Sequence, residues 1–287
     1  MPSLASYRLP EGTHIDYAHL RVKNFQKALA FYKGLLNLTQ VQRQGSTISL
    51  SPTEAGKPIL MLTERPDAIP RPTGSTGLFH IAIRVPNRKE LAKLFRQLSQ
   101  QRYPFQGFAD HGVSEALYLA DPDGNGLEVY ADKPRTEWTF VNGELQMGTW
   151  HLDLDSLLSA YSDNEDDGLH PATDIGHIHL NVSDLSKAER FYADTLGFDV
   201  VQRSYPGALF VSAGGYHHHI GLNTWSGPGA PPPPQNAVGL IRFGIALPDD
   251  RTRTTVQERL RTSEAPLLMT NGTVIARDQD RIEIEIL

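Results

Sequence analysis

The sequence predicts an α+β protein made of four similar modules, and two internal repeats carry this prediction. Residues 17–22 resemble residues 177–182, and the match continues without a gap into the segment that follows. Residues 77–86 resemble residues 239–248, and a charged helical segment follows each of them. Repeats of this length indicate recurring supersecondary units. We therefore expect four modules, each a strand, a helix and about three further strands (βαβββ), paired into two tandem domains.

The composition is that of an ordinary globular protein about two domains long, with 287 residues of which 39% are hydrophobic. The net charge of −6 gives no sign of a basic surface, so we expect no nucleic-acid partner. The absence of cysteine excludes disulfides, thiolate zinc sites, iron–sulfur clusters and cysteine nucleophiles. Any metal must therefore be held by histidine nitrogen and carboxylate oxygen.

The first and third modules open with an alternating strand and continue into an amphipathic helix. Apolar residues recur at helical spacing over 25–36 and 185–196. We expect N-caps at Asn24 and Asp184 and helix stops at Asn37 and Gly197. The second and fourth modules end in a turn and a final strand, in which Asp121 precedes Glu128 and Asp278 precedes Glu285 by the same seven residues.

Shifts in composition divide the chain. Residues 134–173 are acidic and irregular, with four carboxylates within 163–167 and one expected helix around 152–161. The run Pro231–Pro234 predicts a stiff connector between the third and fourth modules. We expect an N-terminal domain over 1–133, a linker over 134–173 and a C-terminal domain over 174–287. No signal peptide or membrane span is recognisable, which predicts a cytoplasmic protein without a membrane partner.

Histidines and glutamates of the C-terminal half form the candidate site. His177 and His179 share one face of a strand, because residues two apart project the same way. Residues 217–219 are a run of three histidines that opens another strand, so either His218 or the pair of its neighbours faces the site. Glu285 lies on the last strand. Internal His runs between apolar strands at a repeated module position favour metal ligands.

At these residues the sequence resembles the vicinal oxygen chelate superfamily, which includes glyoxalases, bleomycin-resistance proteins and extradiol dioxygenases. The resemblance spans nearly the whole chain and is strongest to the two-domain catechol 2,3-dioxygenases. It implies that each domain is an open, U-shaped mixed β-barrel flanked by helices. It also implies that the C-terminal domain binds the metal and that the N-terminal domain does not.

Carried over to this chain, the family pattern implies the metal ligands His177, His218 and Glu285, with His219 as the competitor of His218. Tyr17 stands at the matching position of the N-terminal half. Two imidazoles and one carboxylate form the facial triad of non-haem iron enzymes. Fe(II) is therefore the expected cofactor, with Mn, Zn or Ni as alternatives.

The chain departs from the family pattern in its proton-transfer groups. The usual acid/base histidine before the second ligand has no counterpart in residues 203–209. We expect His179, His217 or His219 to take this role, with Arg242 as an anion-stabilising group. His80 and Glu128 occupy ligand positions of the second module, but we expect them to be remnants of a site, because the first module offers them no partners.

The resemblance implies an iron(II)-dependent extradiol dioxygenase that opens catechol-like or hydroquinone-like rings with O2, in the catabolism of aromatic compounds. The expected partners are a small aromatic diol and O2, and a homo-oligomer is compatible with the fold. One alternative is a glyoxalase-like lyase or isomerase that uses its metal as a Lewis acid. Another is a protein of the same fold that binds a small molecule without turnover.

Overall fold

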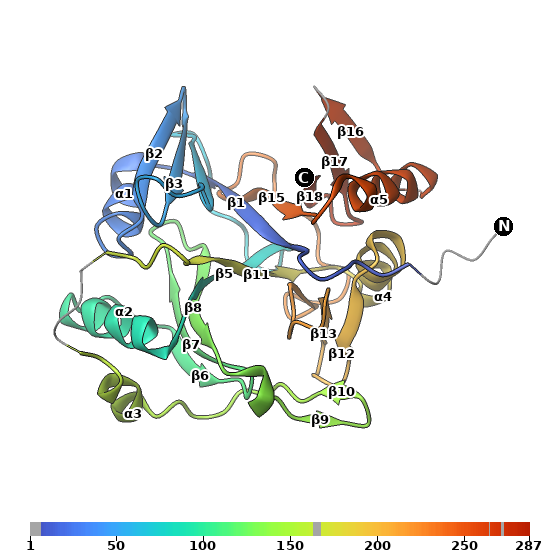
Figure 1. Ribbon diagram of the computed structural model, residues 1–287. Coiled ribbons are helices and arrows are strands. Elements are labelled where there is room, and N and C mark those ends of the chain that lie inside the picture. Colours follow the sequence, from blue (N-terminus) through green and yellow to red (C-terminus); the bar gives the residue numbers. More distant parts are fainter. Residues whose placement is uncertain (1–6, 163–167, 264, 271–272) are drawn as a thin grey trace.

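The computed structural model describes residues 7–162, 168–263, 265–270 and 273–287, so the acidic run expected over 163–167 lies outside the described residues. It contains two eight-stranded mixed sheets and a two-stranded hairpin (Figure 1). The predicted α+β class and the four βαβββ modules are confirmed. Among the described residues, no helix is both long enough and apolar enough to cross a membrane.

The first sheet, sheet I, is built by the first and fourth modules in the order β16-β17-β18-β15-β1-β4-β3-β2. Its strands from the first module are β1 (His14–Val22), β2 (Thr39–Gln44), β3 (Thr47–Ser51) and β4 (Leu60–Glu64). Those from the fourth module are β15 (Gly239–Ala246), β16 (Leu267–Thr270), β17 (Thr273–Arg277) and β18 (Glu283–Ile286).

The second sheet, sheet II, is built by the second and third modules in the order β12-β13-β14-β11-β5-β8-β7-β6. Its strands from the second module are β5 (Gly77–Val85), β6 (Gly107–Asp110), β7 (Ser114–Ala120) and β8 (Gly126–Asp132). Those from the third module are β11 (Asp174–Asn181), β12 (Asp199–Gln202), β13 (Ala208–Ser212) and β14 (Ile220–Asn223).

The pairing of the modules differs from the one we expected. The sequence paired consecutive modules within each half of the chain. In the structure β1 pairs antiparallel with β15, and β5 pairs antiparallel with β11, so each sheet takes one module from each half. The division of the chain into 1–133, 134–173 and 174–287 stays a prediction about folding units. Each sheet contains strands from both the N-terminal and the C-terminal range.

The helices of the first and third modules begin where the sequence placed them, but the first ends at Tyr32, before the expected stop at Asn37. The four module helices are α1 (Phe25–Tyr32), α2 (Arg88–Gln100), α4 (Leu185–Glu189) and α5 (Asp250–Thr262). The side chains of Asn24 and Asp184 accept from the backbone N–H groups of Lys27 and Lys187 and so cap α1 and α4. Helix α4 continues as a π-helical turn over Arg190–Leu196 and stops at Gly197, which has a positive φ of 100°.

The segment between the two halves contains the expected helix and additional short elements. Helix α3 (Leu154–Ser159) lies within the range 152–161. It is preceded by a 3-10 turn (Arg135–Glu137) and by the hairpin of β9 (Phe140–Val141) and β10 (Glu144–Leu145). This segment lies along sheet II, because Trp150 forms a backbone bridge to Asp110 of β6.

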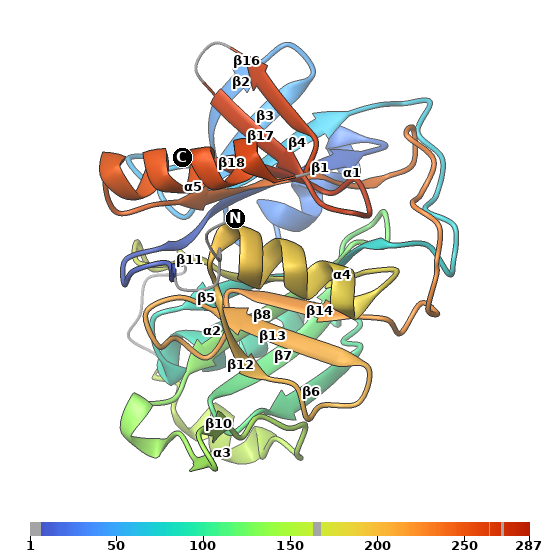
Figure 2. The same ribbon diagram turned by 90° about the vertical axis from the view of Figure 1, so that its right-hand side faces the viewer.

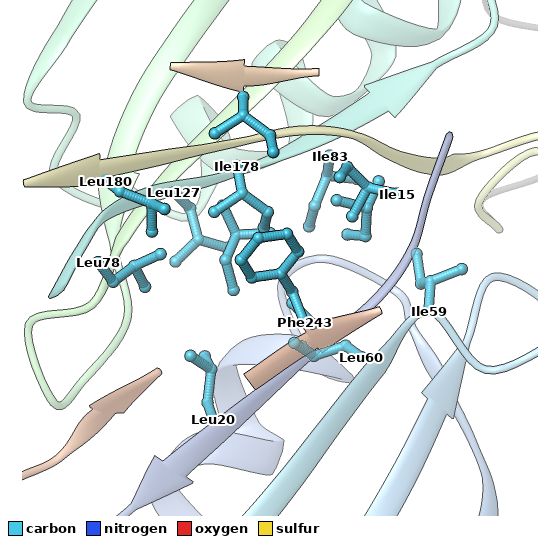
Figure 3. Packing of buried hydrophobic residues seen from close by; sticks show 14 of the residues in the cluster. Ile15, Leu20, Ile59, Leu60, Leu78, Ile83, Leu127, Ile178, Leu180 and Phe243 are labelled. Atoms are coloured by element: carbon cyan, nitrogen blue, oxygen red, sulfur yellow. The ribbon is translucent and has the colours of Figure 1, made fainter. Parts of the chain in front are cut away.

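The main core lies between the two sheets. Ile178 and Leu180 of β11 and Ile83 of β5 point toward Leu20 of β1 and Phe243 of β15 (Figure 3). All five side chains are buried. Because side chains alternate along a strand, the residues between them point to the opposite face of each sheet, where a site can form. Helix α5 packs on the π-helical continuation of α4 at one side of this sandwich (Figure 2), where Arg259 donates to the carbonyl oxygen of Thr195 at 2.9 Å.

Two buried tyrosine–aspartate hydrogen bonds join the modules of sheet I to those of sheet II. The hydroxyl of Tyr32, at the end of α1 in module one, donates to Asp121 of module two at 2.9 Å. The Tyr192 hydroxyl of module three donates to Asp278 of module four at the same distance. Asp121 also accepts from the N–H groups of Asp123 and Asn125, which fixes the turn before β8. The repeated aspartate thus positions the final strand of its module.

Candidate metal centre and cavity

The two central strands of sheet II carry histidines that face away from the core. His80 lies on β5, and His177 and His179 lie on β11. The antiparallel register places His179 opposite His80 and His177 opposite Ala82. All three imidazoles are buried. The same-face placement of His177 and His179 expected from the strand alternation is what brings them beside His80.

Glu128 completes this cluster from the neighbouring strand. Strand β8 runs parallel to β5, and its register places Glu128 beside Ala82, one pleat from His80. The Glu128 Oε2 atom lies 3.0 Å from His80 Nε2 and 3.3 Å from His177 Nε2. The two Nε2 atoms are 3.4 Å apart. Three potential ligand atoms from three adjacent strands therefore converge on one point, all within 4.8 Å of one another.

The donor set of this cluster fits a divalent first-row metal. Two imidazoles and a carboxylate are the ligands of the facial triad, which leaves coordination positions open. The Nδ1 atom of His177 has no hydrogen-bond partner among the described residues, so only Nε2 is engaged in the cluster. Among the described residues this is also the one group of histidine and carboxylate side chains close enough to hold an ion.

The electrostatics of the cluster favour the protonation states that ligands need. Burial lowers the pKa of His177 to about 4, so its imidazole is neutral at pH 7. Burial alone would raise the pKa of Glu128, but His177 and His80 hold it well below its usual value. Metal ligands must be a neutral imidazole and an ionised carboxylate. His177 and Glu128 meet these requirements near neutral pH.

A cavity of about 390 Å³ opens beside this cluster. His80, Glu128 and His177 form part of its wall, together with His179 and His218. The remaining wall is largely apolar and aromatic, with Phe79, Leu127, Met147, Tyr205, Phe210 and Trp225. No lysine or arginine is among the described residues that line it. Such a cavity accommodates a flat, uncharged ring beside the metal ligands.

Behind His218, a chain of hydrogen bonds leads out of the cavity. The Nδ1 atoms of His218 and His217 are 2.7 Å apart, and His217 Nε2 lies 2.9 Å from Asp132 Oδ1. Asp132 also contacts Arg84 at 3.3 Å and accepts from the Tyr216 hydroxyl at 3.1 Å. If His217 donates to Asp132, its Nδ1 accepts from His218. This assignment leaves His218 Nε2 unprotonated.

The other two histidines of the predicted proton-transfer set lie in different places. His179 lines the cavity, and its Nε2 atom has no partner among the described residues. Burial lowers the pKa of His179 well below its usual value. His219 does not line the cavity, and its Nδ1 accepts from the backbone N–H of Ala213 at 3.1 Å. The histidine run precedes β14 rather than lying in it, so strand alternation does not decide which of its members faces the site.

Glu285 and Arg242 are not brought to this cavity. Both belong to sheet I, on β18 and β15. The Glu285 carboxylate accepts from the Tyr17 hydroxyl and lies 3.9 Å from Arg242. Arg242 also lies 3.4 Å from Glu283. The expected combination of His177, His218 and Glu285 is therefore not assembled, because its carboxylate is in the other sheet.

His80 and Glu128, which we expected to be remnants, stand in the cluster instead. They occupy the first-strand and last-strand positions of the second module, which is the signal that singles them out in the sequence. Their partner was sought in the first module, whereas the structure supplies His177 from the third. The error lay in the pairing of the modules and not in the choice of residue types.

Comparison with known proteins identifies the family. The model of the Glyoxalase/Bleomycin resistance protein/Dioxygenase superfamily matches residues 14–129 and 174–286, and the chain belongs to this superfamily. A catechol-2,3-dioxygenase of Bacillus subtilis (strain 168) is 42% identical over 272 residues, which cover 93% of this chain and 94% of that protein. The putative ring-cleaving dioxygenase MhqA of the same organism is 28% identical over 121 residues, or 40% of this chain and 38% of that protein.

Solved structures agree with the fold. A putative dioxygenase from Bacillus subtilis superposes with a TM-score of 0.69 at 14% identity and covers 97% of this chain and 85% of its own. Glyoxalase I from Zea mays superposes with a TM-score of 0.58 at 15% identity, over 96% of this chain and 92% of its own. At these identities the likeness concerns the fold alone. The 42% identity over nearly the whole chain marks it as an enzyme of the dioxygenase group.

Proposed function

We propose that this protein is an iron(II)-dependent extradiol dioxygenase that opens the ring of a catechol-like diol with O2. The observation that carries the proposal is the convergence of His80, His177 and Glu128 beside a cavity with an aromatic wall. Fe(II) held by these residues would supply the redox chemistry that joins dioxygen to the ring. The relative with 42% identity is a catechol-2,3-dioxygenase, which supports the same reaction here.

The number of protein ligands favours this reaction over a lyase with a fully occupied metal. In sheet II, Gly221 lies beside His179 on the parallel strand β14, just as Glu128 lies beside Ala82 on the parallel strand β8. Gly221 therefore occupies, in the third module, the position that Glu128 has in the second. A Cβ atom at position 221 would lie 2.9 Å from the His179 ring. No fourth side-chain ligand fits there. A set of three leaves room for both oxygens of a diol and for O2.

The side chains around the cavity assign the remaining roles. His218 Nε2 accepts the proton of a diol hydroxyl, and the hydrogen bonds through His217 to Asp132 hold the ring and its tautomer. His179 is neutral, and its Nε2 atom, which has no partner in the described part of the chain, accepts a hydrogen bond from the substrate. Tyr118, whose hydroxyl lies 2.6 Å from His111 Nε2, lines the same wall. The absence of lysine and arginine from the wall favours diols without a carboxylate substituent.

The ligand assignment is tested with a matched pair of glutamates. Wild-type protein, Glu128→Gln and Glu285→Gln are reconstituted anaerobically with Fe(II), and iron content, O2 uptake and the coloured ring-opened product of catechol are measured. We expect Glu128→Gln to lose iron and activity more than about 100-fold, since loss of a ligand exceeds the 10–100-fold cost of losing one of its outer partners. Glu285→Gln retains both within a few-fold. Loss of iron in Glu285→Gln alone would overturn the assignment, and no O2 uptake by the wild type with any catechol would overturn the function.

The role of His218 is tested separately from the metal. We expect His218→Gln to retain iron and to lower kcat by about 10²–10⁴-fold, the usual contribution of a positioned acid or base. His219→Gln is the matched control, because this neighbour lies outside the cavity wall. Equal losses in the two variants, or loss of iron from His218→Gln, would contradict the assigned role.

A further inference from the structure

A second cavity, of about 380 Å³, lies at the point where the two connecting segments between modules cross from sheet to sheet. We call it the arginine cavity, because Arg21, Arg71, Arg277 and Arg281 line it. Its apolar wall includes Leu78, Pro233 and Leu240. None of these residues belongs to the metal centre or its cavity.

The walls of the arginine cavity are held by backbone hydrogen bonds. One connecting segment leads from β4 to β5 and the other, with the proline run, from β14 to β15. The N–H of Thr76 donates to the carbonyl oxygen of Pro231 at 2.9 Å, and the N–H of Val238 donates to that of Ile69 at 2.9 Å. Arg21 is fastened to the same wall through a 2.8 Å bond to the carbonyl oxygen of Ala237. The cavity is therefore built by ordered chain.

The positive charges of this cavity are not balanced by its carboxylates. Glu283 is already paired with Arg277 at 2.7 Å and with Arg242 at 3.4 Å. Asp280 accepts from the backbone N–H of Ser183 at 3.0 Å. Within the described ranges, no carboxylate oxygen lies within 4.0 Å of the guanidinium of Arg21 or Arg71.

Arg71 shows the imbalance most clearly. It is half-buried, and its one hydrogen bond to the described part of the chain goes to the carbonyl oxygen of Leu78. Burial lowers the pKa of Arg71, and burial together with the charge of Arg65 lowers that of Arg21. An unpaired charge that is removed from water is destabilising until an anion accompanies it. Guanidinium groups bind carboxylate and phosphate oxygens through paired N–H donors.

We propose that the arginine cavity is a second small-molecule site, which binds an organic oxyanion, carboxylate or phosphate, through Arg21 and Arg71 and covers its apolar part with Leu78, Pro233 and Leu240. Because the cavity joins the two connecting segments, a bound anion ties both sheets together. The site is separate from the proposed ring-cleaving centre and stands whether or not that activity is confirmed.

The experiment compares the thermal unfolding of the full chain with three probes at matched ionic strength. The probes are inorganic phosphate, cyclohexanecarboxylate and its neutral isostere cyclohexanecarboxamide, each balanced against sodium chloride. A ligand that binds the folded state raises Tm with concentration. We expect at least one of the two anions to raise Tm. We expect no effect of the carboxamide or of the sodium chloride used to match the ionic strength. Which anion acts distinguishes a phosphate from a carboxylate ligand.

Substitutions place the effect in the cavity. Titration calorimetry should show that Arg71→Gln and Arg21→Gln each weaken binding at least about tenfold, as expected for loss of a charged hydrogen bond. Arg253→Gln, an exposed arginine of α5, is the control with the same loss of charge and should bind as the wild type does. Arg71→Lys keeps the charge without the paired donors and serves if Arg71→Gln does not fold. No effect of either anion on the wild type, or unchanged binding in the Arg21/Arg71 double variant, would overturn the proposal.

Discussion

Sheets I and II have the same strand order and register, yet they place different side chains at equivalent positions. In sheet II, His177 is opposite Ala82, and Glu128 lies beside Ala82 on the parallel strand. In sheet I, Tyr17 is opposite Gly244, and Glu285 lies beside Gly244 in the same way. Arg242 then stands where His80 stands in the other sheet, because it is opposite His19 as His80 is opposite His179.

The difference lies in what surrounds the carboxylate. In sheet II two imidazoles face Glu128, and among the described residues no lysine or arginine forms an ion pair with it. In sheet I the Tyr17 hydroxyl donates to Glu285, and Arg242 lies 3.9 Å from it. Burial and the hydrogen bond to Glu285 raise the pKa of Tyr17, so the phenol keeps its proton. The carboxylate of sheet I is thus satisfied by the chain itself, whereas that of sheet II lies in a group of side chains that could hold an ion.

The comparison shows that the fold supplies the same three positions twice and that the side chains decide which copy could hold a metal ion. This also explains why Glu285 looked like a ligand in the sequence. It occupies the position that Glu128 has in sheet II, but in the sheet whose other two positions hold a phenol and a guanidinium.

The largest effect is expected when the N-terminal and C-terminal halves of the chain are separated. Because β11 pairs with β5 and β15 pairs with β1, a fragment of residues 174–287 loses the neighbours of both first strands and exposes two sheet edges. We expect fragments 1–133 and 174–287 to be unfolded alone, by circular dichroism and urea titration, and to recover structure when co-expressed. A fragment 174–287 that unfolds cooperatively as a monomer would support the two consecutive domains that the sequence predicts.

The second prediction converts the sheet I site into a copy of the sheet II site. Tyr17→His combined with Arg242→His places two imidazoles beside Glu285 and removes the internal counter-charge. We expect metal bound per chain, measured by elemental analysis after dialysis against Zn²⁺ or Fe(II), to rise from one equivalent to two. Tyr17→Phe with Arg242→Leu, which removes the same groups without adding ligands, is the control and should stay at one. If the double histidine variant also binds only one equivalent of metal, the equivalent backbone register of sheet I is not sufficient to create a metal site.

The smallest effect concerns His19, the sheet I counterpart of His179. Burial, aided by the charges of Arg242 and Arg21, lowers the pKa of His19 to about 4. Its value in the unfolded chain is about 6.5. Between pH 6.5 and 4 the unfolded state therefore binds a proton at His19 that the folded state does not bind. The free energy of unfolding falls as the pH falls through this range.

Substitution of His19 should flatten this pH dependence. We expect His19→Gln to reduce the slope of the unfolding free energy between pH 4.5 and 6.5 by at most about 1.4 kcal/mol per pH unit, the effect of one proton. Urea unfolding in the presence of a chelator measures the slope without a contribution from bound metal. His14→Gln, an exposed histidine of the same strand, is the control. Equal slopes in the wild type and His19→Gln would show that His19 does not titrate between the two states.

Much of the local structure could be predicted from the sequence. The N-caps at Asn24 and Asp184 and the stop at Gly197 depend on neighbouring residues only, and the structure contains all three. The outward face of His177 and His179 likewise follows from strand alternation. The side of the histidine run was not predictable in this way, since the residues before β14 are not in a strand.

The residue types of the candidate metal centre, imidazole and carboxylate without sulfur, were determined by the sequence alone, and so were the four modules and the shared face of His177 and His179. Only the tertiary structure decided that the second module pairs with the third, and hence that His177 meets His80 and Glu128 instead of Glu285. The physical reason is that strand alternation and helix caps are local interactions. The choice of partner strand depends on packing between segments that are about a hundred residues apart, and similar modules offer similar edges to more than one partner.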